Sequence, residues 1–94
     1  MRKDLATLME YLDSVNTVTF GFNFFAGTVS LTTEAYNITT DYEGKTLFVD
    51  DSRLTMEIPI TDNIKIEFTP EGIELQNVGD TGILYQVIYI TVED

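Results

Sequence analysis

Residues 64–92, IKIEFTPEGIELQNVGDTGILYQVIYITV, carry the clearest structural pattern in this chain. Apolar and polar side chains alternate strictly over residues 64–69 and again over residues 73–76, on either side of a Pro-Glu-Gly turn at 70–72. Residues 82–92 are apolar at nearly every position. Because successive side chains of a strand point to opposite faces, the stretch predicts a β-hairpin followed by one long, well-covered strand.

The long last strand has two explanations. Its apolar residues divide between both faces of the pleat, with Leu84, Ile88, Ile90 and Val92 on one face and Ile83, Tyr85, Val87 and Tyr89 on the other. Such a strand is either central in its sheet, with both faces covered, or it lies against another subunit. Burial within one chain shields the strand more simply, and this favours the central position.

The one predicted helix spans residues 4–15, where Asp4 can cap the first turn and its charge suits the helix dipole. Five apolar residues repeat along it at helical spacing: Leu5, Leu8, Met9, Leu12 and Val15. A short helix with a single apolar stripe is typical of one that covers a face of a sheet. A helix that binds a partner is the alternative.

The rest of the chain follows a period of two. A bend is predicted at residues 33–34, with Tyr36 and Ile38 continuing on the apolar side. Gly44 can supply a positive φ in a turn, and Pro59 ends a strand or places it at an edge. Further turns or loops are predicted at residues 25–27, 50–53 and 77–81.

These patterns define the predicted fold. Residues 1–94 form a single α+β domain, since 94 residues bury enough surface for one modest core. One N-terminal helix packs on a twisted antiparallel sheet of six to eight strands. Short gaps between strands permit hairpins and leave no room for crossover helices, so the sheet is a meander or a half-barrel.

Composition argues against an enzyme. The chain has no His and no Cys, and its serines lack a partner base, so a nucleophile with an orienting base is missing. The oxygen-rich segments at residues 50–52 and 62–63 lack the spacing of a calcium-binding loop, and we interpret them as solvated turns. No catalytic residue, no cofactor and no metal site is predicted. An enzyme with a pair of carboxylates is the alternative.

Charge restricts the partners. Sixteen carboxylates face five Lys and Arg, a net charge of −11. Direct binding of DNA or RNA is excluded on this ground, and an anionic membrane surface would repel the domain. No run approaches the ~20 apolar residues of a membrane span, and residues 1–13 do not form a signal peptide. We therefore expect a protein of the cytoplasm whose macromolecular partner is a basic protein surface.

The net charge of −11 is larger than solubility requires. A small domain needs a net charge of only about 2–8 units. Outward residues two apart on a strand are ~6.6 Å from each other, so a sheet and its turns can hold carboxylates in an array that imitates a phosphate backbone. Lys65 and Arg53 interrupt this array. The predicted partner-binding residues are Asp41, Glu43, Asp50, Asp51, Glu57, Asp62, Glu67, Glu71 and Glu74.

In size, charge, lack of Cys and α+β layout, the chain resembles the small acidic inhibitors that phages use against host nucleases, of which anti-CRISPR proteins are the best-known group. The resemblance is one of profile and carries no sequence motif. It implies a DNA mimic in the host cell cytoplasm that blocks the guide-, target- or PAM-binding surface of a Cas-type nuclease. The alternative is a structural or assembly domain that self-associates through its C-terminal strand as a homodimer.

Overall fold

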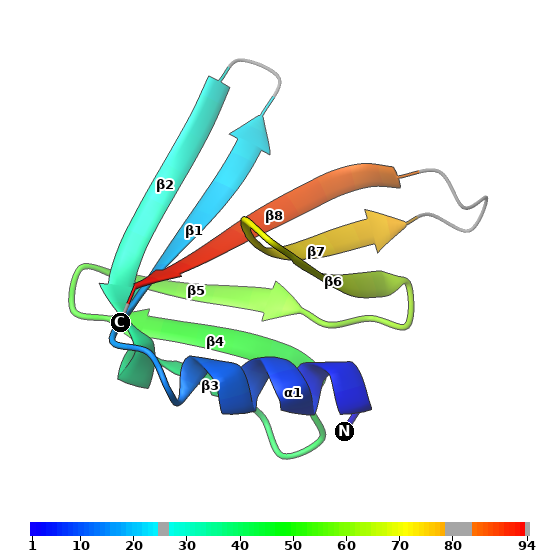
Figure 1. The fold of residues 1–94 in the computed structure, drawn as a ribbon, viewed down its shortest axis with the longest axis horizontal. Coiled ribbons are helices and arrows are strands. Elements are labelled where there is room, and N and C mark those ends of the chain that lie inside the picture. Colours follow the sequence, from blue (N-terminus) through cyan, green and yellow to red (C-terminus); the bar gives the residue numbers. More distant parts are fainter. Residues whose placement is uncertain (25–26, 79–83, 94) are drawn as a thin grey trace.

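The computed structural model describes residues 1–24, 27–78 and 84–93. Within them the chain forms one α-helix, one short 3-10 helix and eight strands (Figure 1). In chain order these are α1 (Lys3–Leu12), β1 (Thr17–Phe24), β2 (Gly27–Glu34), η1 (Ala35–Asn37), β3 (Ile38–Thr40), β4 (Thr46–Asp51), β5 (Leu54–Pro59), β6 (Ile64–Thr69), β7 (Gly72–Val78) and β8 (Leu84–Glu93). The predicted α+β class and the predicted number of strands are confirmed.

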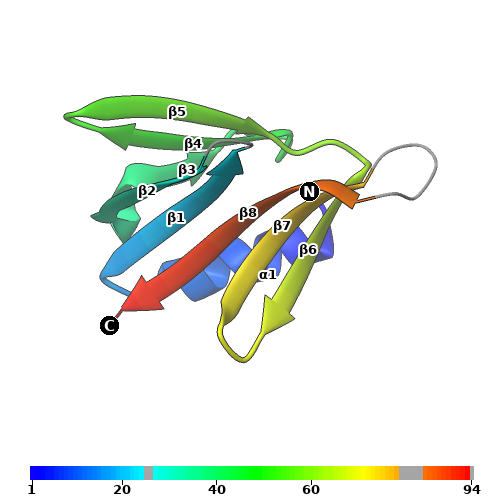
Figure 2. The same ribbon diagram turned by 90° about the horizontal axis from the view of Figure 1, so that it is seen from above.

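The strands form two antiparallel sheets. A five-stranded sheet has the order β2-β1-β8-β7-β6, and a three-stranded sheet has the order β3-β4-β5. Figure 2 looks onto the outward face of the larger sheet, with α1 behind it and the smaller sheet along one side. The division follows from η1, which turns the chain out of the larger sheet after Glu34. The Ala35 N–H still donates to the Asn16 carbonyl at 2.9 Å, and the next strand begins in the other sheet.

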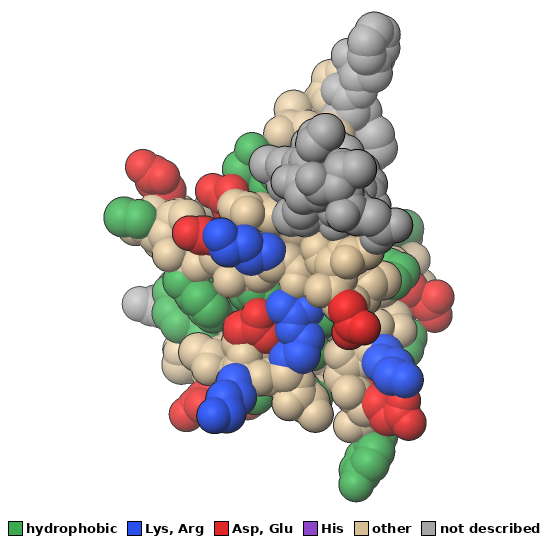
Figure 3. Space-filling model, turned by 90° about the vertical axis from the view of Figure 1, so that its right-hand side faces the viewer, with side chains coloured by type: hydrophobic (Ala, Val, Ile, Leu, Met, Phe, Trp, Pro, Cys, Tyr) green, Lys and Arg blue, Asp and Glu red, His purple; other side chains and the backbone are tan. Residues whose placement is uncertain are grey.

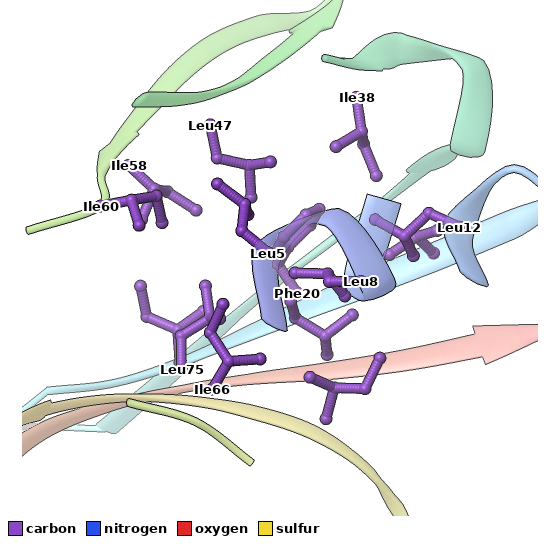
Figure 4. Packing of buried hydrophobic residues seen from close by; sticks show 14 of the residues in the cluster. Leu5, Leu8, Leu12, Phe20, Ile38, Leu47, Ile58, Ile60, Ile66 and Leu75 are labelled. Atoms are coloured by element: carbon purple, nitrogen blue, oxygen red, sulfur yellow. The ribbon is translucent and has the colours of Figure 1, made fainter. Parts of the chain in front are cut away.

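The core lies between the helix and the two sheets (Figure 4). Leu5, Leu8 and Leu12 are almost fully buried, which confirms that the apolar stripe of the helix covers a sheet. The helix ends at Leu12, earlier than predicted, where the Asp13 N–H donates to a carbonyl of the last turn. Arg2 occupies the N-cap position, so Asp4 acts within the first turn, accepting the Leu5 N–H at 2.8 Å.

Strand β8 is central, because β1 pairs with one of its edges and β7 with the other. The predicted central position is confirmed. The expectation that both faces are covered is wrong, since Ile88 and Ile90 are buried on the inward face while Tyr89 on the outward face is 41% exposed. Tyr89 on the second face therefore forms part of the surface.

Several local predictions can be compared with the structure. Gly44 has a φ of 73°, and Pro59 ends a strand at the edge of the smaller sheet, both as predicted. The prediction of a bend at residues 33–34 is wrong, because β2 runs through Glu34. The prediction that Tyr36 lies on the apolar side is also wrong, because its side chain is 80% exposed. The turn at 25–27 and the loop at 77–81 fall largely outside the described residues.

In the described part of the chain, no helix has the length and apolarity to cross a membrane.

Candidate protein-binding surface

The nine carboxylates predicted to bind a partner divide between the two sheets and the turns. Glu67 and Glu74 take outward positions on the five-stranded sheet, while Asp50 and Glu57 take outward positions on the three-stranded sheet. The others lie in or beside turns: Asp41, Glu43, Asp51, Asp62 and Glu71. The structure therefore places Glu67 opposite Glu74 and does not gather the nine on one face.

Glu67 and Glu74 are directly opposite each other on β6 and β7. Like charges in this position repel, and each side chain has a local partner that reduces the cost. The Lys65 ammonium lies 2.9 Å from a Glu67 carboxylate oxygen. The Gln76 side-chain amide donates to Glu74 at 3.1 Å. The partner of Glu74 is thus an uncharged amide, and none of the ion pairs among the described residues involves Glu74.

Basic residues neutralise other members of the predicted set. Lys45 lies 3.1 Å from Glu43, and both side chains are well exposed. Asp41 accepts the Lys45 backbone N–H at 2.7 Å, which fixes the turn before β4. Figure 3 shows the same mixing, with Lys and Arg side chains beside Asp and Glu on the face it draws. A continuous phosphate-like track is absent from the described surface.

Asp51 has a structural role. Its carboxylate accepts hydrogen bonds from the Arg53 guanidinium at 3.1 Å and from the Thr33 hydroxyl at 2.8 Å. The Arg53 side chain and backbone N–H groups, with the Thr33 hydroxyl, hold the pKa of Asp51 well below its ordinary value. Arg53 also donates to the Thr32 carbonyl at 2.9 Å. The cluster therefore ties the smaller sheet to the edge of the larger one.

The outward face of the five-stranded sheet is acidic, and we call it the acidic sheet face. The register places four glutamates there, on four of its five strands: Glu34, Glu67, Glu74 and Glu93. Lys65 is the one basic residue among the described positions of this face. Threonine and serine occupy most of its remaining positions on β1 and β2. The face therefore has a clear negative excess.

Tyr89 lies near the middle of the acidic sheet face. It is opposite Gly21 of β1 on one side and opposite Glu74 of β7 on the other. Gly21 carries no side chain to pack against Tyr89, and a Cβ at that position would lie 3.6 Å from the Tyr89 Cβ. Partly exposed tyrosines are enriched at the centres of protein interfaces, where they combine apolar area with a hydroxyl group.

Glu34 and Glu93 were not among the predicted site residues. Both are exposed, and both are aligned with Thr17 of β1, one on each side of it. The alternation that placed Tyr89 outward also places Glu93 outward. Glu34 was hidden by the bend predicted at residues 33–34. Extending the strand pattern by one residue would have found it.

A groove of about 360 Å³ lies between Tyr11 of α1 and the turn from β6 to β7, with Phe68 and Pro70 among its lining residues. Glu71 is the single carboxylate in its lining, so the groove does not present a carboxylate pair.

Across the described residues, no group of three or more acidic side chains is placed to hold a metal ion. Comparisons with protein-family models, with curated proteins and with solved structures found no significant match to this chain.

Proposed function

We propose that the protein is a non-enzymatic inhibitor that binds a basic, nucleic-acid-binding surface of another protein through the acidic sheet face. One observation supports this most directly. Four glutamates and an exposed tyrosine share an open sheet face that has a single described lysine. The proposed partner is a Cas-type nuclease, the class that the resemblance to anti-CRISPR proteins implies.

The proposed mechanism has two parts. Long-range attraction between the acidic domain and a basic groove speeds association, and it weakens as salt screens the charges. Once the groove is occupied, the glutamates pair with lysines and arginines that otherwise hold phosphates, while Tyr89 supplies a buried apolar contact. Inhibition then follows from competition for the groove and requires no chemical step.

Two triple variants with equal charge changes test the proposal. Glu34→Gln, Glu74→Gln and Glu93→Gln neutralise the acidic sheet face, while Asp50→Asn, Glu57→Gln and Asp62→Asn remove the same charge elsewhere. Each is titrated against purified Cas-type nucleases, with DNA cleavage as a second readout, at several salt concentrations.

We expect the first triple to weaken binding by about tenfold or more and to reduce the salt dependence, because specific charge pairs are lost. The second triple should weaken binding by less than about threefold, through net charge alone. Equal losses for the two triples would show that net charge and not the acidic sheet face carries the binding. Absence of binding at low salt, or binding that ignores salt, would contradict the proposal itself.

Self-association through the C-terminal strand remains the competing hypothesis, and the fold restricts how it would occur. Both edges of β8 are paired within the chain, so only its outward face is open to a second copy. Two acidic sheet faces brought together would repel. Light scattering at high protein concentration separates the hypotheses, because a strict monomer removes the second one.

A further inference from the structure

We propose that the free edge of β2 is a docking site for an extended segment of a partner protein, which would add to the five-stranded sheet as a further strand. This mode of recognition relies on backbone hydrogen bonds, with side-chain contacts giving specificity. The site uses the backbone edge of β2 and not the outward side chains of the acidic sheet face, and it does not depend on the function proposed for that face.

The register shows which backbone groups of β2 point away from the sheet. The Ala35 N–H donates to the Asn16 carbonyl, so this pair is hydrogen-bonded across β1 and β2. Hydrogen-bonded and non-hydrogen-bonded pairs alternate in an antiparallel ladder. The N–H and C=O groups of Thr28, Ser30 and Thr32 therefore face outward. The Arg53 side chain, which reaches the Thr32 carbonyl from outside the sheet, agrees with this orientation.

Every other edge strand carries a feature that discourages pairing. β6 has Lys65 and Glu67 along it, β5 contains Glu57 and ends at Pro59, and β3 is three residues long. Natural proteins protect sheet edges with such charges, prolines and short strands. β2 has eight residues, and residues 27–33 contain neither a charge nor a proline. Among the described residues, Arg53 covers one carbonyl of this edge, while residues 27–30 are exposed and Leu31 is partly buried.

The side chains of β2 indicate the chemistry of the added strand. Val29 points to the inward side of the sheet and is nevertheless 54% exposed, and Leu31 next to it is partly buried. An added strand would place alternate apolar side chains beside these two residues. Thr28 and Ser30 face the polar side. The net charge of −11 favours a segment with lysine or arginine over an acidic one.

A second copy of this chain is a poorer occupant. Pairing of two β2 edges about a twofold axis at Ser30 would align Thr28 of one copy with Thr32 of the other. The Arg53 guanidinium already occupies the Thr32 carbonyl, so it stands in the path of that pairing. Two copies also carry the same large negative charge. A twofold axis at Val29 would avoid Arg53, so the like charge of two copies is what favours a foreign, basic segment over residues 27–31.

The probe is a blocked heptapeptide in which valine and threonine alternate between terminal lysines. Amide hydrogen exchange of the full chain is followed by NMR as the peptide is added. At saturation we expect exchange at Thr28 and Ser30 to slow by about tenfold or more, because the added strand protects these amides. Ser30→Pro removes one outward N–H, which an edge strand tolerates. In this variant the peptide should no longer slow the exchange of the Thr28 amide. Ser30→Ala keeps the N–H and should behave as the natural protein.

A second peptide keeps the test decisive if Ser30→Pro fails to fold. The same heptapeptide, N-methylated on the residues that would face β2, should leave the exchange at Thr28 and Ser30 unchanged. The triple variant Glu34→Gln, Glu74→Gln and Glu93→Gln should retain the protection by the unmodified peptide. Unchanged exchange with the unmodified peptide, or equal protection by the methylated one, would overturn the proposal. So would protection at these amides that depends on protein concentration without peptide, which would indicate a second copy.

Discussion

At the scale of single residues, Gly72 leaves the least room for a side chain among the glycines that the structure describes. A Cβ there would lie 2.5 Å from the Ile90 carbonyl oxygen, which belongs to the backbone of β8 and cannot move away easily. Gly72→Ala should therefore lower the free energy of unfolding by about 1–3 kcal/mol, measured by urea denaturation. Gly21→Ala is the matched control, because its Cβ would meet only ordinary contacts at 3.6 Å. Equal destabilisation by the two substitutions would show that Gly72 is not special.

The second prediction concerns the pH dependence of the contribution that Asp51 makes to stability. Its folded-state pKa is depressed below the ordinary 3.8. Below pH 3.8 the unfolded chain takes up a proton that the folded chain refuses, so the contribution of Asp51 to stability is complete above that pH and declines as pH falls. Urea denaturation should show Asp51→Asn to be less stable at pH 6, with the difference shrinking below about pH 4. A difference that stays constant down to about pH 2 would contradict the assigned role.

At the scale of elements, the helix is held by its buried leucine stripe. Leu8 is fully buried in the core, and Leu8→Ala should cost about 2–5 kcal/mol of unfolding free energy. Thr7 is exposed on the opposite side, and Thr7→Ala should change stability by less than about 0.5 kcal/mol. Both values come from urea denaturation followed by circular dichroism. If Leu8→Ala were neutral, the helix would not be part of the cooperative fold.

The elements were largely predictable, because alternation and helical spacing are local signals. Ile64, Ile66, Ile73 and Leu75 are buried as their alternation predicted. The division into two sheets was not predictable, since it depends on a three-residue helical turn that interrupts a run with the same period on both sides. Tyr36 lies in that turn, and it is exposed because the period of two fails there. Non-local pairing, and not propensity, determined which strands became neighbours.

At the scale of the whole molecule, the same limit applied to the candidate surface. Outward positions such as Glu57 and Glu74 were predicted correctly from alternation. Their division between two sheets followed from strand order, which one sequence does not reveal. The neutralising pairs are local, and Lys65 with Glu67 or Arg53 with Asp51 are each two residues apart on the chain. The spacing of such pairs is visible in the sequence, and it identifies Asp51 and Glu67 as carboxylates with a local basic partner.

The last prediction follows from the net charge and concerns how salt changes the stability of the fold. Two like charges about 10 Å apart repel by about 0.4 kcal/mol in water, and sixteen carboxylates against five basic groups contain many such pairs. Salt shortens the Debye length from about 30 Å at 0.01 M to about 8 Å at 0.15 M, which screens this repulsion. The four ion pairs among the described residues also weaken with salt, but three of them have both side chains partly or well exposed and contribute only about 0–1 kcal/mol each; in the fourth, Asp51 is largely buried. Repulsion should dominate, so the urea midpoint should rise with sodium chloride over this range. The triple variant Glu34→Gln, Glu74→Gln and Glu93→Gln should show a smaller rise, whereas a midpoint that falls with salt would mean that the ion pairs outweigh the repulsion.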